Sequence, residues 1–114
     1  MLKLYGKLCN ESGKDNVGTG IRVGTKRIDA VVKGDGFYDI YEVKTAPNSF
    51  DCVTEALGQI CQYAYLYRRD KIGKMVIVGA AAASPEVDQY LSWCRKKHSK
   101  EVYYLQVPLQ GLKE

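Results

Sequence analysis

The sequence predicts an α/β domain in which helices flank a mixed sheet. Three observations carry this prediction: an Asp-Gly turn between two strand-like segments, a continuous apolar segment at 74–83, and helix signals on both sides of that segment. The expected order is helix, three-stranded meander, helix, strand, helix, strand, which is typical of a mixed sheet covered by helices. At 114 residues the chain is expected to form a single domain, residues 1–114.

A first helix is expected over residues 1–9, because apolar side chains recur there at helical spacing. No capping residue precedes this helix, and it contains no acidic residue. We therefore expect a truncated first helix and a chain that is part of a larger protein. The expected inner stripe consists of Leu2, Tyr5, Leu8 and Cys9.

Three strands are expected next, and the last two should form a hairpin. The first strand is placed at 18–24, and the pair at 27–33 and 37–45. Asp35 and Gly36 separate the paired strands, and Asp-Gly is a strong signal for a two-residue type I′ turn.

This turn also fixes which residues of the two strands face one another. With Asp35 and Gly36 in the turn, Lys33 faces Tyr38, and Asp29 lies directly opposite Glu42. Alternate side chains of a strand share a face. One face is therefore expected to carry Asp29, Val31, Lys33, Tyr38, Ile40, Glu42 and Lys44.

The second half of the chain should add a long helix and a second αβ unit. Ser49 is expected to cap a helix that ends near Arg68. The apolar segment 74–83 fits a strand that is buried on both faces in a parallel arrangement. Ser-Pro-Glu at 84–86 is a strong signal for a further helix, which ends in a basic run, and a last strand is expected at 102–107.

The strand pair suggests a metal site. Two carboxylates that face one another across strands repel, and a bound cation would reverse the sign of that interaction. Mg²⁺ is typically held by one or two carboxylates together with waters and a substrate phosphate. Asp29 and Glu42 supply the carboxylates, the Val43 carbonyl can add an oxygen, and Lys44 can contact the phosphate. The alternative is a solvated face whose acids and lysine form ordinary ion pairs.

Two polar residues of the long helix extend this hypothesis. Gln59 and Tyr63 are four residues apart and therefore lie on one side of the helix. Near the carboxylates, the glutamine can hydrogen-bond a water or a phosphate, and the tyrosine can orient it. The alternative is a glutamine in solvent and a tyrosine in the core.

Taken together, these motifs resemble the PD-(D/E)xK nuclease superfamily, and more narrowly its RecB-type branch, which carries a Q-x-x-x-Y motif. The resemblance extends over residues 17–107. It implies a restriction-endonuclease-like αβββαβ core with an additional C-terminal αβ unit. The residues that carry it are Asp29, Glu42-Val43-Lys44 on the hairpin, and Gln59 with Tyr63 on the next helix.

The resemblance also implies an activity: hydrolysis of phosphodiester bonds in nucleic acid, in DNA rather than RNA, with Mg²⁺ or Mn²⁺. It implies metal ligation by Asp29, Glu42 and the Val43 carbonyl. Two positions depart from the family, because Ile28 stands where a proline is frequent and the first helix lacks the glutamate that many members carry. The residues implied to act in hydrolysis are Asp29, Glu42, Lys44, Gln59 and Tyr63.

The charge of the chain permits a nucleic-acid partner without requiring one, since the formal net charge is only +4. Lys26, Arg27 and Lys33 flank the expected site and are predicted to contact backbone phosphates. The alternative for them is a solvated strand edge, where lysine is common.

Other features narrow the class of protein. No apolar segment has the length of a membrane span or the pattern of a signal peptide, so a cytoplasmic protein without a membrane partner is expected. Two further functions stay open: a non-catalytic nucleic-acid-binding module with the same fold, and a homodimerising domain of a larger protein. Four scattered cysteines are expected to be reduced and to bind no zinc: Cys9, Cys52, Cys61 and Cys94.

Overall fold

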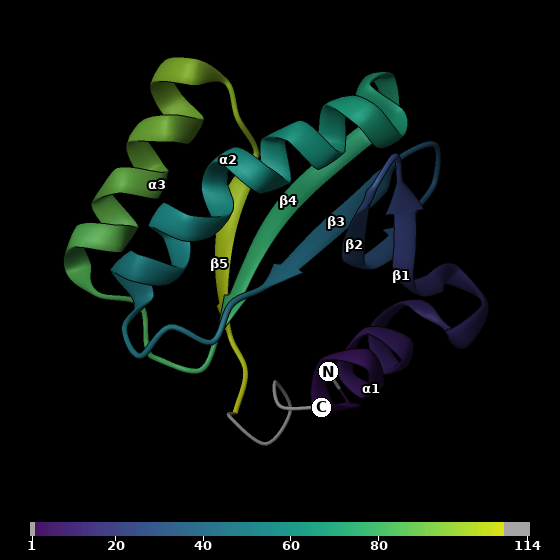
Figure 1. The fold of residues 1–114 in the computed structure, drawn as a ribbon, viewed down its shortest axis with the longest axis horizontal. Coiled ribbons are helices and arrows are strands. Elements are labelled where there is room, and N and C mark those ends of the chain that lie inside the picture. Colours follow the sequence, from purple (N-terminus) through teal and green to yellow (C-terminus); the bar gives the residue numbers. More distant parts are fainter. Residues whose placement is uncertain (1, 109–114) are drawn as a thin grey trace.

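Five strands form one mixed sheet in the order β1-β2-β3-β4-β5, with helices on both faces (Figure 1). This computed structural model describes residues 2–108. β1, β2 and β3 are antiparallel neighbours, whereas β4 runs parallel to both β3 and β5. The elements are α1 (Leu2–Ser12), β1 (Val17–Val23), β2 (Lys26–Lys33), β3 (Tyr38–Val43), α2 (Ser49–Arg68), β4 (Ile72–Gly79), α3 (Pro85–His98) and β5 (Val102–Gln106).

The predicted α/β class and the order of elements are confirmed. Short 3-10 turns precede β1 and β4, at Lys14–Asn16 and Arg69–Lys71. Within residues 2–108, no helix is both long and apolar enough to cross a membrane.

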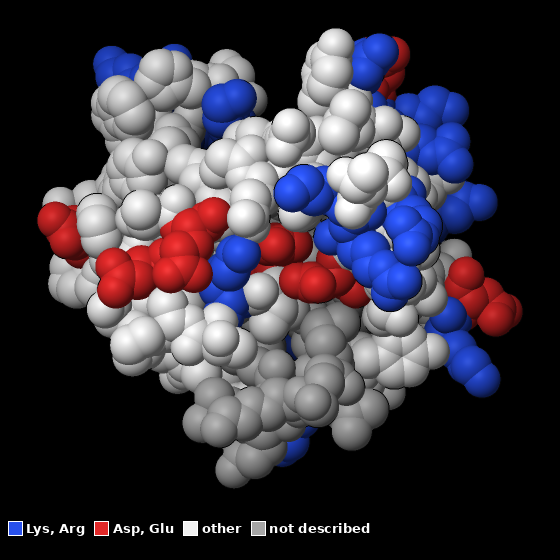
Figure 2. Space-filling model, in the orientation of Figure 1, with Lys and Arg blue, Asp and Glu red and all other residues white. Residues whose placement is uncertain are grey.

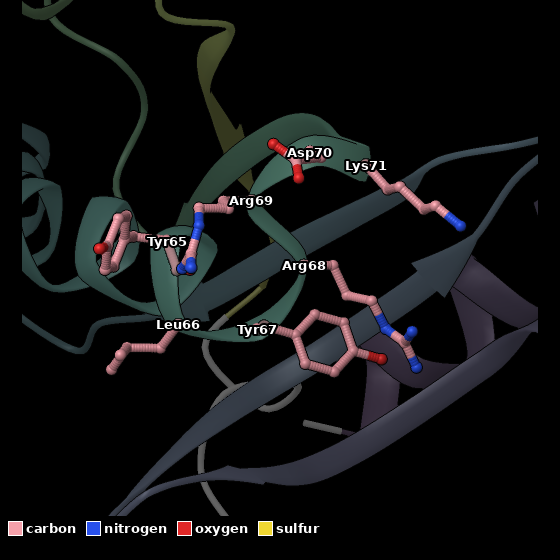
Figure 3. Close-up of a pocket in the computed structure, with 7 residues that line it drawn as sticks. All are labelled: Tyr65, Leu66, Tyr67, Arg68, Arg69, Asp70 and Lys71. Atoms are coloured by element: carbon pink, nitrogen blue, oxygen red, sulfur yellow. The ribbon is translucent and has the colours of Figure 1, made fainter.

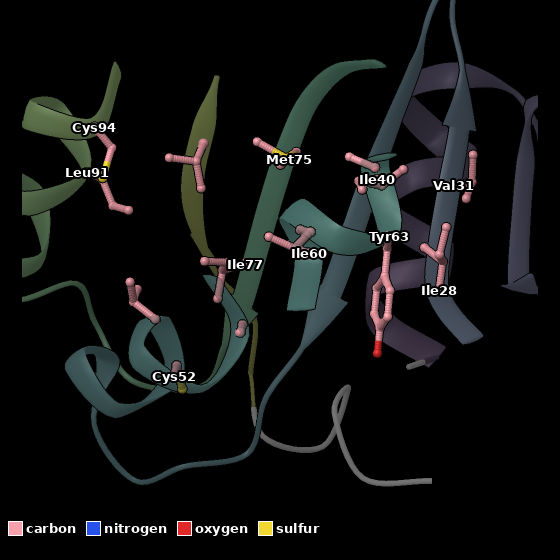
Figure 4. Close-up of a cluster of buried hydrophobic side chains, with 14 of the residues drawn as sticks. Ile28, Val31, Ile40, Cys52, Ile60, Tyr63, Met75, Ile77, Leu91 and Cys94 are labelled. Atoms are coloured by element: carbon pink, nitrogen blue, oxygen red, sulfur yellow. The ribbon is translucent and has the colours of Figure 1, made fainter. Parts of the chain in front are cut away.

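The sheet separates two apolar layers. α2 and α3 cover one face, and their buried side chains pack on the sheet in the cluster shown in Figure 4. α1 covers part of the other face through Leu4 and Leu8, which are fully buried. Burying one such aliphatic side chain contributes about 1.5–3 kcal/mol, so both layers hold the strands in place.

α1 differs from its predicted form in length and in its buried side. It continues to Ser12, and its buried side chains are Leu4 and Leu8, whereas Tyr5 and Cys9 are only half-buried. The predicted stripe was therefore rotated by part of a turn. The side chain of Leu2 lies outside the described part of the chain.

The β2–β3 hairpin has the predicted register but a different turn. Lys33 pairs with Tyr38, and the Gly34 N–H donates to the Phe37 carbonyl at 2.8 Å. A type I′ turn needs a positive φ at both central residues. Only Gly36 has one, at 82°, so the prediction of a type I′ turn was wrong although the pairing was right.

Side-chain hydrogen bonds begin both long helices. Asn48, and not the predicted Ser49, caps α2, because its Oδ1 accepts the Asp51 N–H at 2.9 Å. The hydroxyl oxygen of Ser49 instead accepts the Ser84 N–H at 3.0 Å, which ties the start of α2 to the start of α3. Ser84 caps α3 as predicted, by accepting the Val87 N–H at 3.2 Å.

The buried strand β4 is shorter than predicted. It ends at Gly79, whereas the apolar pattern suggested residue 83. Beyond Gly79 the backbone carbonyls bind side chains of β5 and no longer a neighbouring strand: Ala80 accepts from Gln106 at 3.1 Å, and Ala81 accepts from Tyr104 at 2.7 Å. Within these bounds, the predicted burial of β4 on both faces and its parallel pairing are confirmed.

Candidate metal centre

Asp29 and Glu42 come together where the β2–β3 ladder ends. The last pair of the ladder is Ala30 with Tyr41, and the same register places Asp29 opposite Glu42. Instead of a further backbone bond, the Oδ2 atom of Asp29 accepts the Val43 N–H at 2.7 Å. The aspartate side chain thus closes the ladder, and its carboxylate is held against the end of β3.

A bend in β2 at Asp29 produces this arrangement. Ile28 and Val31 both belong to the cluster under α2, although strict alternation would put them on opposite faces. Gly20 occupies the position opposite Asp29 in the β1–β2 register, and its φ of 60° lies in the left-handed region that glycine tolerates. The predicted regular alternation therefore holds only from Ala30 onward.

Glu42 occupies an unfavourable environment for a charged side chain. Its side chain lies on the α2 side of the sheet and the residue is only 6% exposed, and its Oε1 has no hydrogen-bond partner among residues 2–108. Its Oε2 lies 3.6 Å from the Lys44 Nζ. Burial, followed by the charge of Asp29, raises the pKa of Glu42 to about 7, and Lys44 opposes this shift.

The burial and the raised pKa mean that, without a bound cation, the site disfavours ionisation of Glu42 beside Asp29. A desolvated carboxylate with an unpaired oxygen, next to a second carboxylate, is costly unless a cation compensates it. Hard divalent cations prefer carboxylate, carbonyl and water oxygens, and carboxylate and carbonyl oxygens lie at this end of β3. The orphaned Oε1 and the paired acids therefore fit a cation such as Mg²⁺.

Tyr63 reaches the same region from α2. Its ring lies in the apolar cluster, with the hydroxyl directed away from Ile40 (Figure 4). Burial, with smaller contributions from Glu42 and Asp29, raises the pKa of Tyr63. The hydroxyl is therefore protonated at neutral pH and can donate a hydrogen bond towards the carboxylates.

The remaining predicted residues of the centre occupy different environments. Gln59 precedes Tyr63 by one helical turn and is exposed, so its role in hydrolysis stays a prediction. Val43 is the last residue of β3, and its N–H orients Asp29, a contact that the sequence did not predict. No side-chain pattern could signal this bond, because its donor is a backbone group. Ligation by the Val43 carbonyl stays a prediction.

A third acidic ligand is not found in the part of the chain that the structure describes. There, no group of three or more His, Cys, Asp or Glu residues could hold a metal ion. The acid of α1, Glu11, lies towards Tyr41, which packs with α1 on the other face of the sheet. Burial, followed by the charges of Asp39 and then Glu11, raises the pKa of Tyr41. A metal at Asp29 and Glu42 would therefore complete its shell with carbonyl or water oxygens.

The predicted phosphate-binding cations do not form one group. Lys26 and Arg27 lie at the β1–β2 hairpin, whereas Lys33 lies at the opposite end of β2, beyond the bend at Asp29. All three are exposed. Arg22 faces Arg27 directly across the hairpin, a like-charge pair that disfavours the sheet. Figure 2 shows acidic side chains recessed near the middle of one face, with Lys and Arg side chains gathered beside them over β1 and β2.

Comparisons with known proteins support the fold and add nothing on function. No family model matches the sequence, and no curated protein matches it. The fold is similar to the crystal structure of the protein of unknown function AF1548, with a TM-score of 0.62 and 16% sequence identity. The match covers 96% of this chain, which spans 61% of the length of that protein. At this identity the similarity shows a shared α/β fold.

Proposed function

We propose that this chain is a metal-dependent nuclease domain with a restriction-endonuclease-like fold, of the PD-(D/E)xK type with the Q-x-x-x-Y motif. The observation that carries the proposal is the buried Glu42 Oε1, which has no hydrogen-bond partner within residues 2–108 and lies beside Asp29. A site that serves only the fold would gain from an apolar or neutral residue at position 42. Retaining the charge makes sense when a cation binds there.

Asp29 and Glu42 would hold the metal, Mg²⁺ or Mn²⁺, with the Val43 carbonyl as a further oxygen. The bound ion would supply an activated water and would stabilise the charge that develops on the phosphoryl group. The Val43 N–H, at 2.7 Å from Asp29 Oδ2, fixes the direction of that carboxylate before any ligand binds. Preformed ligands of this kind reduce the reorganisation that binding requires.

Lys44 and Tyr63 are the donors of the site. The Lys44 side chain, which is 19% exposed and lies 3.6 Å from Glu42 Oε2, donates hydrogen bonds to a phosphate oxygen of the substrate. The protonated Tyr63 hydroxyl donates to the same group or to the attacking water. Exposed Gln59, one turn away, contacts the phosphate that follows.

The proposed substrate is nucleic acid, DNA rather than RNA. Arg22 and Arg27, which repel one another in the free protein, gain from a phosphate placed between or beside them. With Lys26 they form a basic hairpin whose second strand, β2, also carries Asp29. Phosphate contacts of this kind position a strand without reading its sequence.

A cleavage assay on single- and double-stranded DNA and RNA, with Mg²⁺ and then Mn²⁺, tests this proposal. We expect cleavage by the wild type, loss of cleavage in Glu42→Gln, and no change in the control Glu55→Gln, which removes an exposed acid of α2. Equal cleavage by the wild type and Glu42→Gln would refute the assignment. Binding of nucleic acid without cleavage under any of these conditions would favour the non-catalytic module.

A further inference from the structure

Arg68, at the end of α2, has an unusual environment for a surface arginine. Its guanidinium carbon lies 5.0 Å from the centroid of the Tyr38 ring and 5.3 Å from that of Tyr67. The two rings meet edge to face at 5.7 Å. Within residues 2–108, Arg68 has no carboxylate within 4.0 Å and makes no side-chain hydrogen bond. Figure 3 shows its guanidinium beside the Tyr67 hydroxyl, over the strands of the sheet.

Packing on aromatic rings prepares a guanidinium for an anion. A ring contacts the flat face of the group and leaves the N–H donors at its edge available. The ring contact also restricts the rotamers of the arginine, so less conformational entropy is lost when those donors bind. A planar donor edge of this kind matches phosphate oxygens in a bidentate manner.

The neighbouring residue shows the contrast. Arg69 stacks on Tyr65 at 4.3 Å, and its Nη1 donates to the Tyr65 carbonyl at 2.9 Å. Part of its donor capacity is therefore used inside the helix end. In Figure 3 it extends along Tyr65, away from the Arg68 guanidinium. Both arginines line a cavity of about 330 Å³ formed by residues 65–71.

The position of Arg68 relates it to the candidate metal centre. Tyr38, on which Arg68 packs, pairs with Lys33 across β2 and β3, so a second cationic residue lies beside Tyr38. Tyr38 and Glu42 are four residues apart on the same strand, on the face that α2 covers. At the usual rise this is roughly 13 Å, a separation that a few nucleotides of one strand span.

We propose that Arg68, packed on Tyr38 and Tyr67 and assisted by Lys33, binds a backbone phosphate of the nucleic-acid strand that is cleaved at Asp29 and Glu42. This inference rests on the proposed function, and it names a contact remote from the cleaved bond.

The test is the binding of a fluorescent DNA oligonucleotide, followed by anisotropy in EDTA at 50 to 200 mM salt, so that no cleavage occurs. Arg68→Gln is compared with Arg69→Gln, which removes the same charge from the adjacent residue. The affinity should fall in Arg68→Gln, and its salt dependence should decrease by about one counterion. Across this salt range, the total affinity change should shrink about threefold. Arg69→Gln should resemble the wild type.

A second variant, Lys33→Gln, guards against an effect of Arg68→Gln on folding, which circular dichroism also checks. Lys33→Gln should lower the affinity and the salt slope in the same way. Equal effects of Arg68→Gln and Arg69→Gln would overturn the proposal, as would the absence of binding by the wild type. If Glu42→Gln abolishes cleavage while Arg68→Gln binds normally, the phosphate site fails and the nuclease assignment stands. If Arg68→Gln weakens binding but neither the wild type nor any variant cleaves, the phosphate site stands and the nuclease assignment fails.

Discussion

Replacing Glu42 by Gln removes a buried charge and keeps the size and shape of the side chain. In the apo protein this charge lies beside Asp29, and one of its oxygens has no hydrogen-bond partner among residues 2–108. We therefore expect Glu42→Gln to be more stable than the wild type when metal is removed. A substitution that destroys function would then stabilise the fold, which is the signature of a residue kept for its ligand.

The size of this effect follows from the pKa of Glu42, which is raised from 4.5 to about 7. Because the folded state binds the Glu42 proton more tightly than the unfolded state does, protonation of Glu42 stabilises the fold. This stabilisation is fully present below pH 4.5. It is lost as the pH rises towards 7. The loss amounts to about 3 kcal/mol at most, since one pKa unit corresponds to about 1.4 kcal/mol. The advantage of Glu42→Gln should grow accordingly, from near zero at pH 4.5 to its full value at pH 8.

Urea unfolding at pH 4.5, 6 and 8 in EDTA measures this difference, with Glu55→Gln as the matched control for loss of one acid. Saturating Mn²⁺ at pH 8 should then stabilise the wild type by about 2.7 kcal/mol at a hundredfold excess over Kd and leave Glu42→Gln unchanged. A pH-independent difference, or a variant less stable than the wild type at pH 8 in EDTA, would refute the reasoning.

Three further predictions concern the fold and the metal. Gly73→Ala would bring a Cβ to 2.6 Å from the Phe37 Cδ2 and should destabilise the fold by about 1–3 kcal/mol. Gly58→Ala, in the middle of α2 with nothing within 4 Å of the new Cβ, should stabilise the fold by up to about 1 kcal/mol. Thermal unfolding compares the stability of both variants with that of the wild type, and the reverse order of stability would contradict the packing. Asn48→Ala removes the cap of α2 and should cost about 1 kcal/mol in urea unfolding, so an unchanged midpoint would show that the cap contributes nothing. Metal affinity, measured by calorimetry, should rise with pH up to about 7 and then level off, because Glu42 must release its proton to bind; a flat profile from pH 5 to 8 would exclude this linkage.

Local signals explain why so much of the fold was predictable. Asp35 and Gly36 predicted the register of β2 and β3, and that register places Asp29 opposite Glu42. Ser84 and the apolar run of β4 marked the second αβ unit in the same way. Each of these features depends on residues that are close in sequence, where propensity and turn chemistry are strong.

The features that escaped prediction depend on contacts between distant segments. The bend at Asp29 lies opposite Gly20 of β1, which has a positive φ, and the aspartate binds a backbone N–H of β3. The packing of Arg68 requires Tyr38, thirty positions earlier in the chain, to lie beneath the end of α2. The periodicity of residues within one helix or strand contains no information on such contacts between distant segments.

Calorimetric titration of the wild type and Glu42→Gln with Mn²⁺ at pH 8 tests the central claim most directly, because it reports on the carboxylate pair without any nucleic acid. We predict saturable binding of one ion per chain to the wild type, and no binding to Glu42→Gln. No binding by the wild type at millimolar Mn²⁺, or equal binding by both proteins, would contradict the claim that Asp29 and Glu42 form a metal centre.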